Sequence, residues 1–176
     1  MSQEIEAAVT EELGGSTTAV AQPVSVVTRM IFAAPPARVW KGLLFYEELG
    51  ARPPLHLRLL LPVPIRTVGK VSDVGDEATC LYEGGHLLKR ITRIERGDLY
   101  EFEVAEQELA VGGGMRLSGG RYTLRELPDS QTELAVETRY VSNKWPRWFW
   151  KRLEAVVCHA FHRYLLSSMR RAIESK

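Results

Sequence analysis

The chain has 176 residues, which fits one domain with a sizeable core, and we expect residues 23–176 to form it. Its 23 Lys and Arg nearly balance 22 Asp and Glu, giving a formal net charge of +1, so we do not expect nucleic acid as a partner. Two cysteines, Cys80 and Cys158, are too few and too far apart for a disulfide framework or a zinc site. We expect both to be thiols of a reducing compartment.

Residues 1–22 are rich in Glu, Ala, Thr, Ser and Gly and lack hydrophobic periodicity, which predicts a mobile N-terminal tail. Glu4, Glu6 and Glu11 stand where a secretory signal would carry positive charge. Farther along, even Leu55–Ile65 is interrupted by charged residues and proline, so no segment is expected to cross a bilayer. These features together predict a cytoplasmic protein.

The ordered part begins at Val24. The β-branched, apolar stretch Val24–Ala33 predicts a strand, and the prolines that follow end it and favour a helix over Pro36–Glu48. The segment Pro53–Pro64 fits neither element cleanly. We expect it to be a loop or a short helix that packs over one mouth of the sheet.

From Ile65 onward the hydrophobic period falls to two and Gly-rich turn signals recur, which predicts a meander of antiparallel strands. The predicted strands are Arg66–Val74, Glu77–Tyr82, His86–Glu95, Leu99–Ala110, Met115–Leu127 and Thr132–Ser142.

A long helix is predicted from about Pro146 nearly to Lys176. At about 100° per residue, one apolar stripe should face the sheet, and it consists of Trp150, Leu153, Val157, Phe161, Tyr164 and Ser168. A second stripe, Ala155, His159, His162, Leu166, Met169 and Ile173, should point away from it. No carboxylate or third ligand stands at a suitable spacing from the two histidines, so we expect no metal site.

This order of elements resembles the START-like superfamily, also called SRPBCC, and within it the polyketide cyclase/dehydrase and lipid-transport group. The likeness extends from Val24 to Ala172, and the stretches that carry it are Val26–Ile31, Ala34–Trp40, Leu88–Ile94 and Gly119–Leu124. It implies an α+β helix-grip fold, in which a curved antiparallel sheet of about seven strands wraps a long C-terminal helix with an apolar cavity between them. Members bind lipids, polyketides, hormones or quinones there. Their catalytic residues differ between branches, so none is transferred by position.

The register of the hairpin around Gly97 decides which polar groups face the helix. A three-residue loop with a bulge would place Leu88, Arg90, Thr92 and Ile94 beside Tyr100, Phe102, Val104 and Glu106 on that face. A two-residue loop would instead place Leu87, Lys89, Ile91 and Arg93 there, since a one-residue slip exchanges the faces. We prefer the first register, because Arg93 then faces outward opposite Glu101.

The leading hypothesis is a protein that carries or sequesters an apolar small molecule and needs no cofactor. The expected wall residues are Trp40, Arg90, Tyr100, Phe102, Glu106, Tyr122, Tyr140, Phe161 and Tyr164. Arg90 and Glu106 would either form a structural ion pair or contact a polar ligand group. The alternative is a cyclase or aromatase-type enzyme in which Arg90, Glu106 or Tyr140 moves a proton. A third reading is an interaction protein with a filled cavity.

Aromatic and basic residues alternate between Lys144 and Arg152. This composition favours a membrane surface or an anionic partner, with Trp145, Arg147, Trp148 and Lys151 as the contacting edge. The alternative is that Pro146 only starts the helix and the aromatic residues close the core. Apolar surface left over on the second stripe could meet a second subunit in a homodimer.

Overall fold

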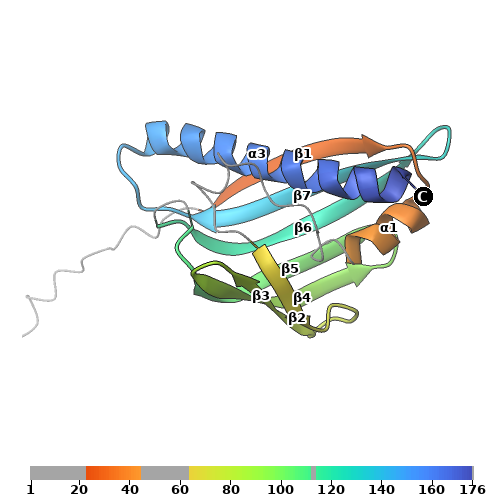
Figure 1. The fold of residues 1–176 in the computed structure, drawn as a ribbon. Coiled ribbons are helices and arrows are strands. Elements are labelled where there is room, and N and C mark those ends of the chain that lie inside the picture. The colour runs from red at the N-terminus through yellow and green to blue at the C-terminus, as the bar shows by residue number, and fades with distance from the viewer. Residues whose placement is uncertain (1–22, 45–63, 112–113, 176) are drawn as a thin grey trace, which may run out of the picture.

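The computed structural model describes residues 23–44, 64–111 and 114–175. In this part of the chain, seven strands form one antiparallel sheet that curves beneath a long helix, α3, and a short helix, α1, packs near the end of α3 (Figure 1). The strand order is β1-β7-β6-β5-β4-β3-β2. The strands are β1 (Val24–Phe32), β2 (Pro64–Gly69), β3 (Glu77–Tyr82), β4 (Gly85–Glu95), β5 (Leu99–Glu108), β6 (Arg116–Leu127) and β7 (Gln131–Val141), and the helices are α1 (Pro36–Leu44) and α3 (Arg147–Glu174).

The predicted fold class is confirmed, and most strand bounds agree to within one or two residues. The exception is β2, which was expected over Arg66–Val74 but ends at Gly69, where φ is +131°. Beyond it the Asp76 carboxylate accepts hydrogen bonds from the backbone N–H groups of Ser72 (3.0 Å) and Asp73 (3.1 Å). An aspartate that bonds nearby backbone in this way favours a turn over a continued strand.

Three expectations fall outside the described residues. They are the N-terminal tail (1–22), the part of the first helix beyond Leu44, and the cover segment before Pro64. Neither described helix is long and apolar enough to cross a membrane.

The strands β1 and β7 pair along their whole length, from Val24 opposite Tyr140 to Phe32 opposite Thr132. This pairing joins the start of the domain to the end of the meander. At the turn into α1, the Thr132 hydroxyl donates to the carbonyl oxygen of Ala34 (2.7 Å), and this buried bond fastens the connection to the sheet.

Register shifts bend the sheet toward α3. The β4–β5 pair shifts between Leu88 and Lys89 and again between Ile91 and Arg93, and the β6–β7 pair shifts between Leu117 and Gly119. Such bulges increase local twist and curvature. Gly119 has a φ of 154°, and a Cβ there would collide with the carbonyl oxygen of Phe102, so the strand approaches its neighbour more closely than any larger residue allows.

The main hydrophobic core lies between the sheet, α1 and the C-terminal half of α3. On α3 the buried residues are Glu154, His162, Leu165, Leu166, Ser168, Met169 and Ile173. Four of these belong to the stripe that was expected to point away from the sheet, so the prediction for that stripe is wrong. Aliphatic side chains make the close contacts with the sheet, while the aromatic Phe161 and Tyr164 are only half-buried and line a cavity.

The first turns of α3 are held by a buried carboxylate. Glu154 is 3% exposed and accepts hydrogen bonds from the Ser142 hydroxyl (2.6 Å) and from the Arg147 guanidinium (2.7 Å). Arg147, expected at the outer edge, therefore directs its charge inward. Burial and the nearby Glu154 charge raise the pKa of Tyr140 to about 12. This polar cluster ties α3 to the end of β7.

Replacing Glu154 with Leu should destabilise the protein by about 3 kcal/mol, because the half-buried Arg147 then loses the buried carboxylate with which it pairs. The double variant Arg147→Met/Glu154→Leu should recover part of that loss, since no unpaired charge remains. Urea unfolding of the wild type, both single variants and the double variant measures the coupling. Strictly additive losses would contradict this account of the pair.

Candidate ligand-binding cavity

A cavity of about 540 Å³ lies between the inner face of the sheet and α3. The strands β2 to β7 all contribute lining residues, as does one side of α3, and most of this lining is apolar. A smaller chamber of about 90 Å³ shares Tyr82, Leu87, Leu117, Thr138, Phe161 and His162 with it and extends toward the start of α3. The larger chamber falls in the usual size range of small-molecule pockets, about 300–1,000 Å³.

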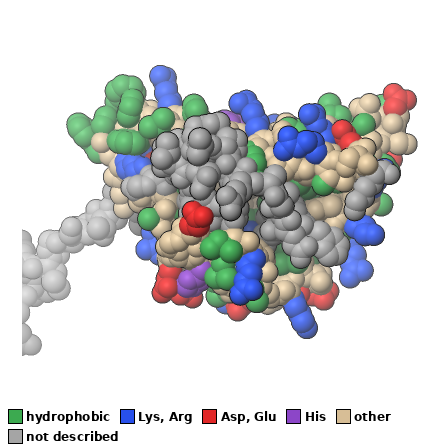
Figure 2. Space-filling model, in the orientation of Figure 1, with side chains coloured by type: hydrophobic (Ala, Val, Ile, Leu, Met, Phe, Trp, Pro, Cys, Tyr) green, Lys and Arg blue, Asp and Glu red, His purple; other side chains and the backbone are tan. Residues whose placement is uncertain are grey.

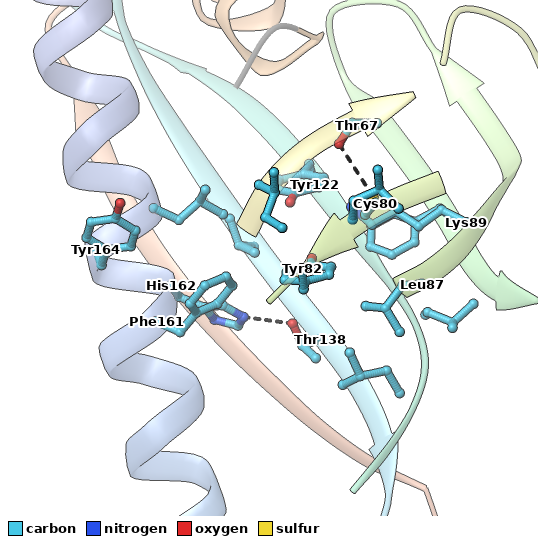
Figure 3. A pocket seen from close by; sticks show the side chains of 18 of the residues that line it. Thr67, Cys80, Tyr82, Leu87, Lys89, Tyr122, Thr138, Phe161, His162 and Tyr164 are labelled. Atoms are coloured by element: carbon cyan, nitrogen blue, oxygen red, sulfur yellow. Dashed lines mark hydrogen bonds between the residues drawn. The ribbon is translucent and has the colours of Figure 1, made fainter. Parts of the chain in front are cut away.

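The wall follows from strand alternation and from one side of the helix. Phe102 and Val104 point inward from β5, Val136 and Thr138 from β7, and the pleat places the residues between them on the other face. From α3, Phe161 and Tyr164 close the opposite wall, as Figure 3 shows. Gly119 contributes backbone alone, which leaves room where a side chain would stand.

Four of the predicted wall residues line this cavity: Phe102, Tyr122, Phe161 and Tyr164. The other predicted aromatic residues do not. Tyr100 is buried in the main core, where Trp40 packs edge-on against it with ring centroids 6.5 Å apart. Tyr140 is fully buried in a separate cluster with Val26 and Met115, so its hydroxyl is not at the wall.

The preferred register of the β4–β5 hairpin is wrong around Arg90. Arg90 lies on the outer face and forms ion pairs with Glu77 (2.8 Å) and Glu103 (3.1 Å). Glu106 is also exposed on that face, where its carboxylate lies 3.6 Å from Nε2 of His86. The expected pairing of Arg93 with Glu101 is confirmed. The shift between Ile91 and Arg93 accounts for both results, because the bulge changes the facing on one side of it only.

Lys89 takes the inward position instead. Its side chain is 9% exposed, and its ammonium group lies 4.9 Å from the centre of the Phe102 ring. Arg66 adds a second cation to the lining from β2. The described residues that line the cavity include no carboxylate, so the charged side chains among them, Lys89 and Arg66, are both positive. The alternative register with a two-residue loop had placed Lys89 on this inner face.

His162 is the second polar wall residue that the sequence reasoning missed. It is 1% exposed, with Nδ1 2.9 Å from the Thr28 hydroxyl and Nε2 2.8 Å from the Thr138 hydroxyl (Figure 3 draws the second bond). Thr28 also bonds Nδ1 of His159 (2.8 Å). Burial, helped by neighbouring His159, lowers the pKa of His162 to about 4, so the ring is neutral near pH 7. The expectation that His162 points away from the cavity is therefore wrong, whereas His159 bonds Thr28 and lines neither chamber.

The two cysteines are free thiols, as expected. Cys80 is buried and lines the larger chamber, and Cys158 lines the smaller one. Burial raises the pKa of Cys158 to about 11, which keeps it protonated and poorly nucleophilic near pH 7.

Comparison with solved structures finds many chains of the same architecture. The ZhuI aromatase/cyclase of Streptomyces sp. R1128 superposes with a TM-score of 0.61 at 16% identity, covering 87% of this chain and 94% of that one. A protein of Mesorhizobium loti gives 0.60 at 17% identity, covering 87% and 98%. The Aha1 dimer of Colwellia psychrerythraea gives 0.56 at 13% identity, covering 86% and 96%.

No protein-family model and no curated protein sequence matches the chain. At the identities of the structural matches, the likeness concerns the fold. The chain has the helix-grip fold, as the sequence resemblance implied. Proteins of one fold support unrelated chemistries, so the function has to be argued from the cavity.

Stability should fall with acidity in a way that depends on His162. Its pKa in the folded state, about 4, lies below the ordinary 6.5, so between these values the unfolded chain binds a proton that the folded chain does not. Stability present above pH 6.5 is therefore lost as the pH falls, by about 2 kcal/mol from this residue between pH 7 and pH 5. Urea unfolding of the wild type and of His162→Gln at both pH values measures this difference. An equal pH dependence in the two proteins would contradict it.

Proposed function

We propose that the protein binds an apolar small molecule, such as a lipid, polyketide or quinone, inside the cavity and carries or sequesters it. The observation that carries the proposal is a space of about 540 Å³ inside the fold with aromatic walls from Phe102, Tyr122 and Phe161. Apolar surface gains about 25 cal/mol per Å² when it leaves water. A ligand that fills the space would gain this free energy and would also remove the cost of an unfilled apolar cavity.

The positive charge of Lys89 in the cavity wall favours ligands that carry an acidic group. Lys89 is held within a mostly apolar lining beside the Phe102 ring, and no described lining residue carries negative charge. A ligand with one acidic group, a carboxylate or an enolate, would place that group near Lys89 and its apolar body along Phe161 and Tyr164. A few polar groups in an apolar pocket commonly orient the ligand in this way.

Native mass spectrometry of freshly purified protein, followed by organic extraction, tests the proposal directly. We expect a stoichiometric adduct of apolar character. Conversion of the extracted compound during incubation with the protein would favour instead the aromatase/cyclase activity named for the Streptomyces structure.

Filling the cavity should prevent binding. Val104→Trp places a large ring where Val104 lines the wall, so it should abolish the adduct and weaken uptake of the neutral fluorescent probe N-phenyl-1-naphthylamine by about tenfold or more. Val156→Trp, at a position of α3 that is 64% exposed, is the matched control and should bind like the wild type. Equal probe binding by all three proteins would overturn the proposal.

The role of Lys89 is tested with two ligands that differ only in the head group. Lys89→Met should weaken displacement of the probe by dodecanoate about tenfold, or about 1.4 kcal/mol, and leave displacement by dodecanol nearly unchanged. Arg90→Met removes the neighbouring cation from the outer face and should change neither value. Parallel loss of acid and alcohol binding in Lys89→Met would show that Lys89 only packs the wall.

A further inference from the structure

Large apolar side chains are exposed together where α3 begins. The exposed fractions are 86% for Trp145, 68% for Trp148, 48% for Phe149, 43% for Leu153 and 64% for Val156, and we call these five residues the aromatic edge. Figure 2 shows hydrophobic side chains gathered at the end of the molecule where α3 starts in Figure 1. A contiguous exposed apolar patch on a folded protein usually marks a contact surface.

The aromatic edge is held in place by its own contacts. The Trp150 indole donates to the carbonyl oxygen of Trp145 (3.1 Å), and the Phe149 ring stands edge-on to both Trp148 and Trp150, with centroids 6.0 and 5.5 Å apart. Side chains that are already ordered lose little conformational freedom on binding. The Trp148 and Phe149 rings and the Trp145 backbone are therefore already in place before any partner arrives.

The charge around the aromatic edge is positive. Between residues 142 and 160 the chain carries four cations, Lys144, Arg147, Lys151 and Arg152, and one carboxylate, Glu154. Glu154 is buried and its charge is met by Arg147, which leaves Lys151 and Arg152 exposed without a carboxylate beside them on the helix. The exposed charged residues of α3 are all basic until Glu174 near its end.

An apolar line of side chains connects this surface to the cavity. Phe149, Leu153, Val157 and Phe161 follow one another at intervals of four residues, so they lie along one side of the helix. The first two are exposed, while Val157 and Phe161 line the smaller chamber. An apolar molecule arriving at the aromatic edge would meet apolar side chains along this path.

We propose that the aromatic edge docks on the surface of an anionic lipid bilayer, with Trp145 and Trp148 at the headgroup level and Lys151 and Arg152 against the lipid phosphates and carboxylates. Exposed tryptophans bordered by cations suit that interface, where apolar burial and attraction to anionic lipid add together. A second copy of the chain is a poorer occupant. A two-fold contact through this patch would bring two sets of the same cations together.

Cosedimentation with vesicles of phosphatidylcholine, with and without phosphatidylserine, tests the docking. The wild type should bind the phosphatidylserine vesicles, and added salt should weaken this binding. Trp145→Ser/Trp148→Ser and Lys151→Glu/Arg152→Glu should each lower partitioning about tenfold or more. All four positions are exposed, so the thermal melting of these variants should stay near the wild-type value.

The matched control is Arg163→Glu/Arg170→Glu, which makes the same change in net charge at exposed positions farther along α3. It should retain most of the binding. Equal loss in this control would show diffuse electrostatic attraction and overturn the proposal, as would the absence of binding to either vesicle. A wild-type dimer in sedimentation velocity that Trp145→Ser/Trp148→Ser converts to monomer would assign the surface to a second copy.

This docking does not depend on the proposed ligand. Val104→Trp, which fills the cavity and changes no residue of the aromatic edge, should bind vesicles like the wild type. Failure of the cavity proposal and failure of the docking proposal are therefore separate results.

Discussion

The structure depends on the way α3 is fixed along the β1–β7 side of the curved sheet, while the cavity lies between one side of the helix and the rest of the sheet. Toward its C-terminus, Leu166, Met169 and Ile173 pack closely with the main core. At its start, Glu154 ties the helix to the end of β7 through Ser142. Between these two anchors, Phe161 and Tyr164 are only half-buried, and a cavity remains between them and the concave sheet.

Hydrogen bonds from His162 fix the middle of α3 to the sheet. His162 bonds Thr28 on β1 and Thr138 on β7, so it fixes the rotation of α3 over two neighbouring strands. A neutral imidazole has one donor and one acceptor nitrogen, and two hydroxyls can satisfy both. The low pKa keeps the ring in this state. A hydrophobic residue could fill the same volume, but it would not define the helix position through directed bonds.

The sequence predicts the architecture well and the facing of individual residues poorly. Strand periodicity and turn signals depend on local chemistry, which is why six of the seven strands lie close to their expected bounds. The side on which Lys89 and Arg90 stand depends on two bulges in the β4–β5 pair, and these arise from the geometry between strands. His162 was misplaced because its helix was assumed to bury its most aromatic stripe. Part of that stripe lines a cavity, and another part is exposed.

The aromatic stripe of α3 is exposed to solvent at the start of the helix and lines the cavity farther along. This difference along one helix is the clearest link between the fold and the proposed function. In a helix that only completes a core, Phe149 and Leu153 would be buried like Leu165 and Leu166. Here the apolar side chains continue past the cavity and beyond the edge of the sheet to solvent, where the neighbouring charges are positive. Exposed apolar side chains favour aggregation unless a partner covers them. One helix therefore supplies a cavity wall and an outer apolar surface, which are the two features that the proposed ligand binding and the proposed membrane docking each require.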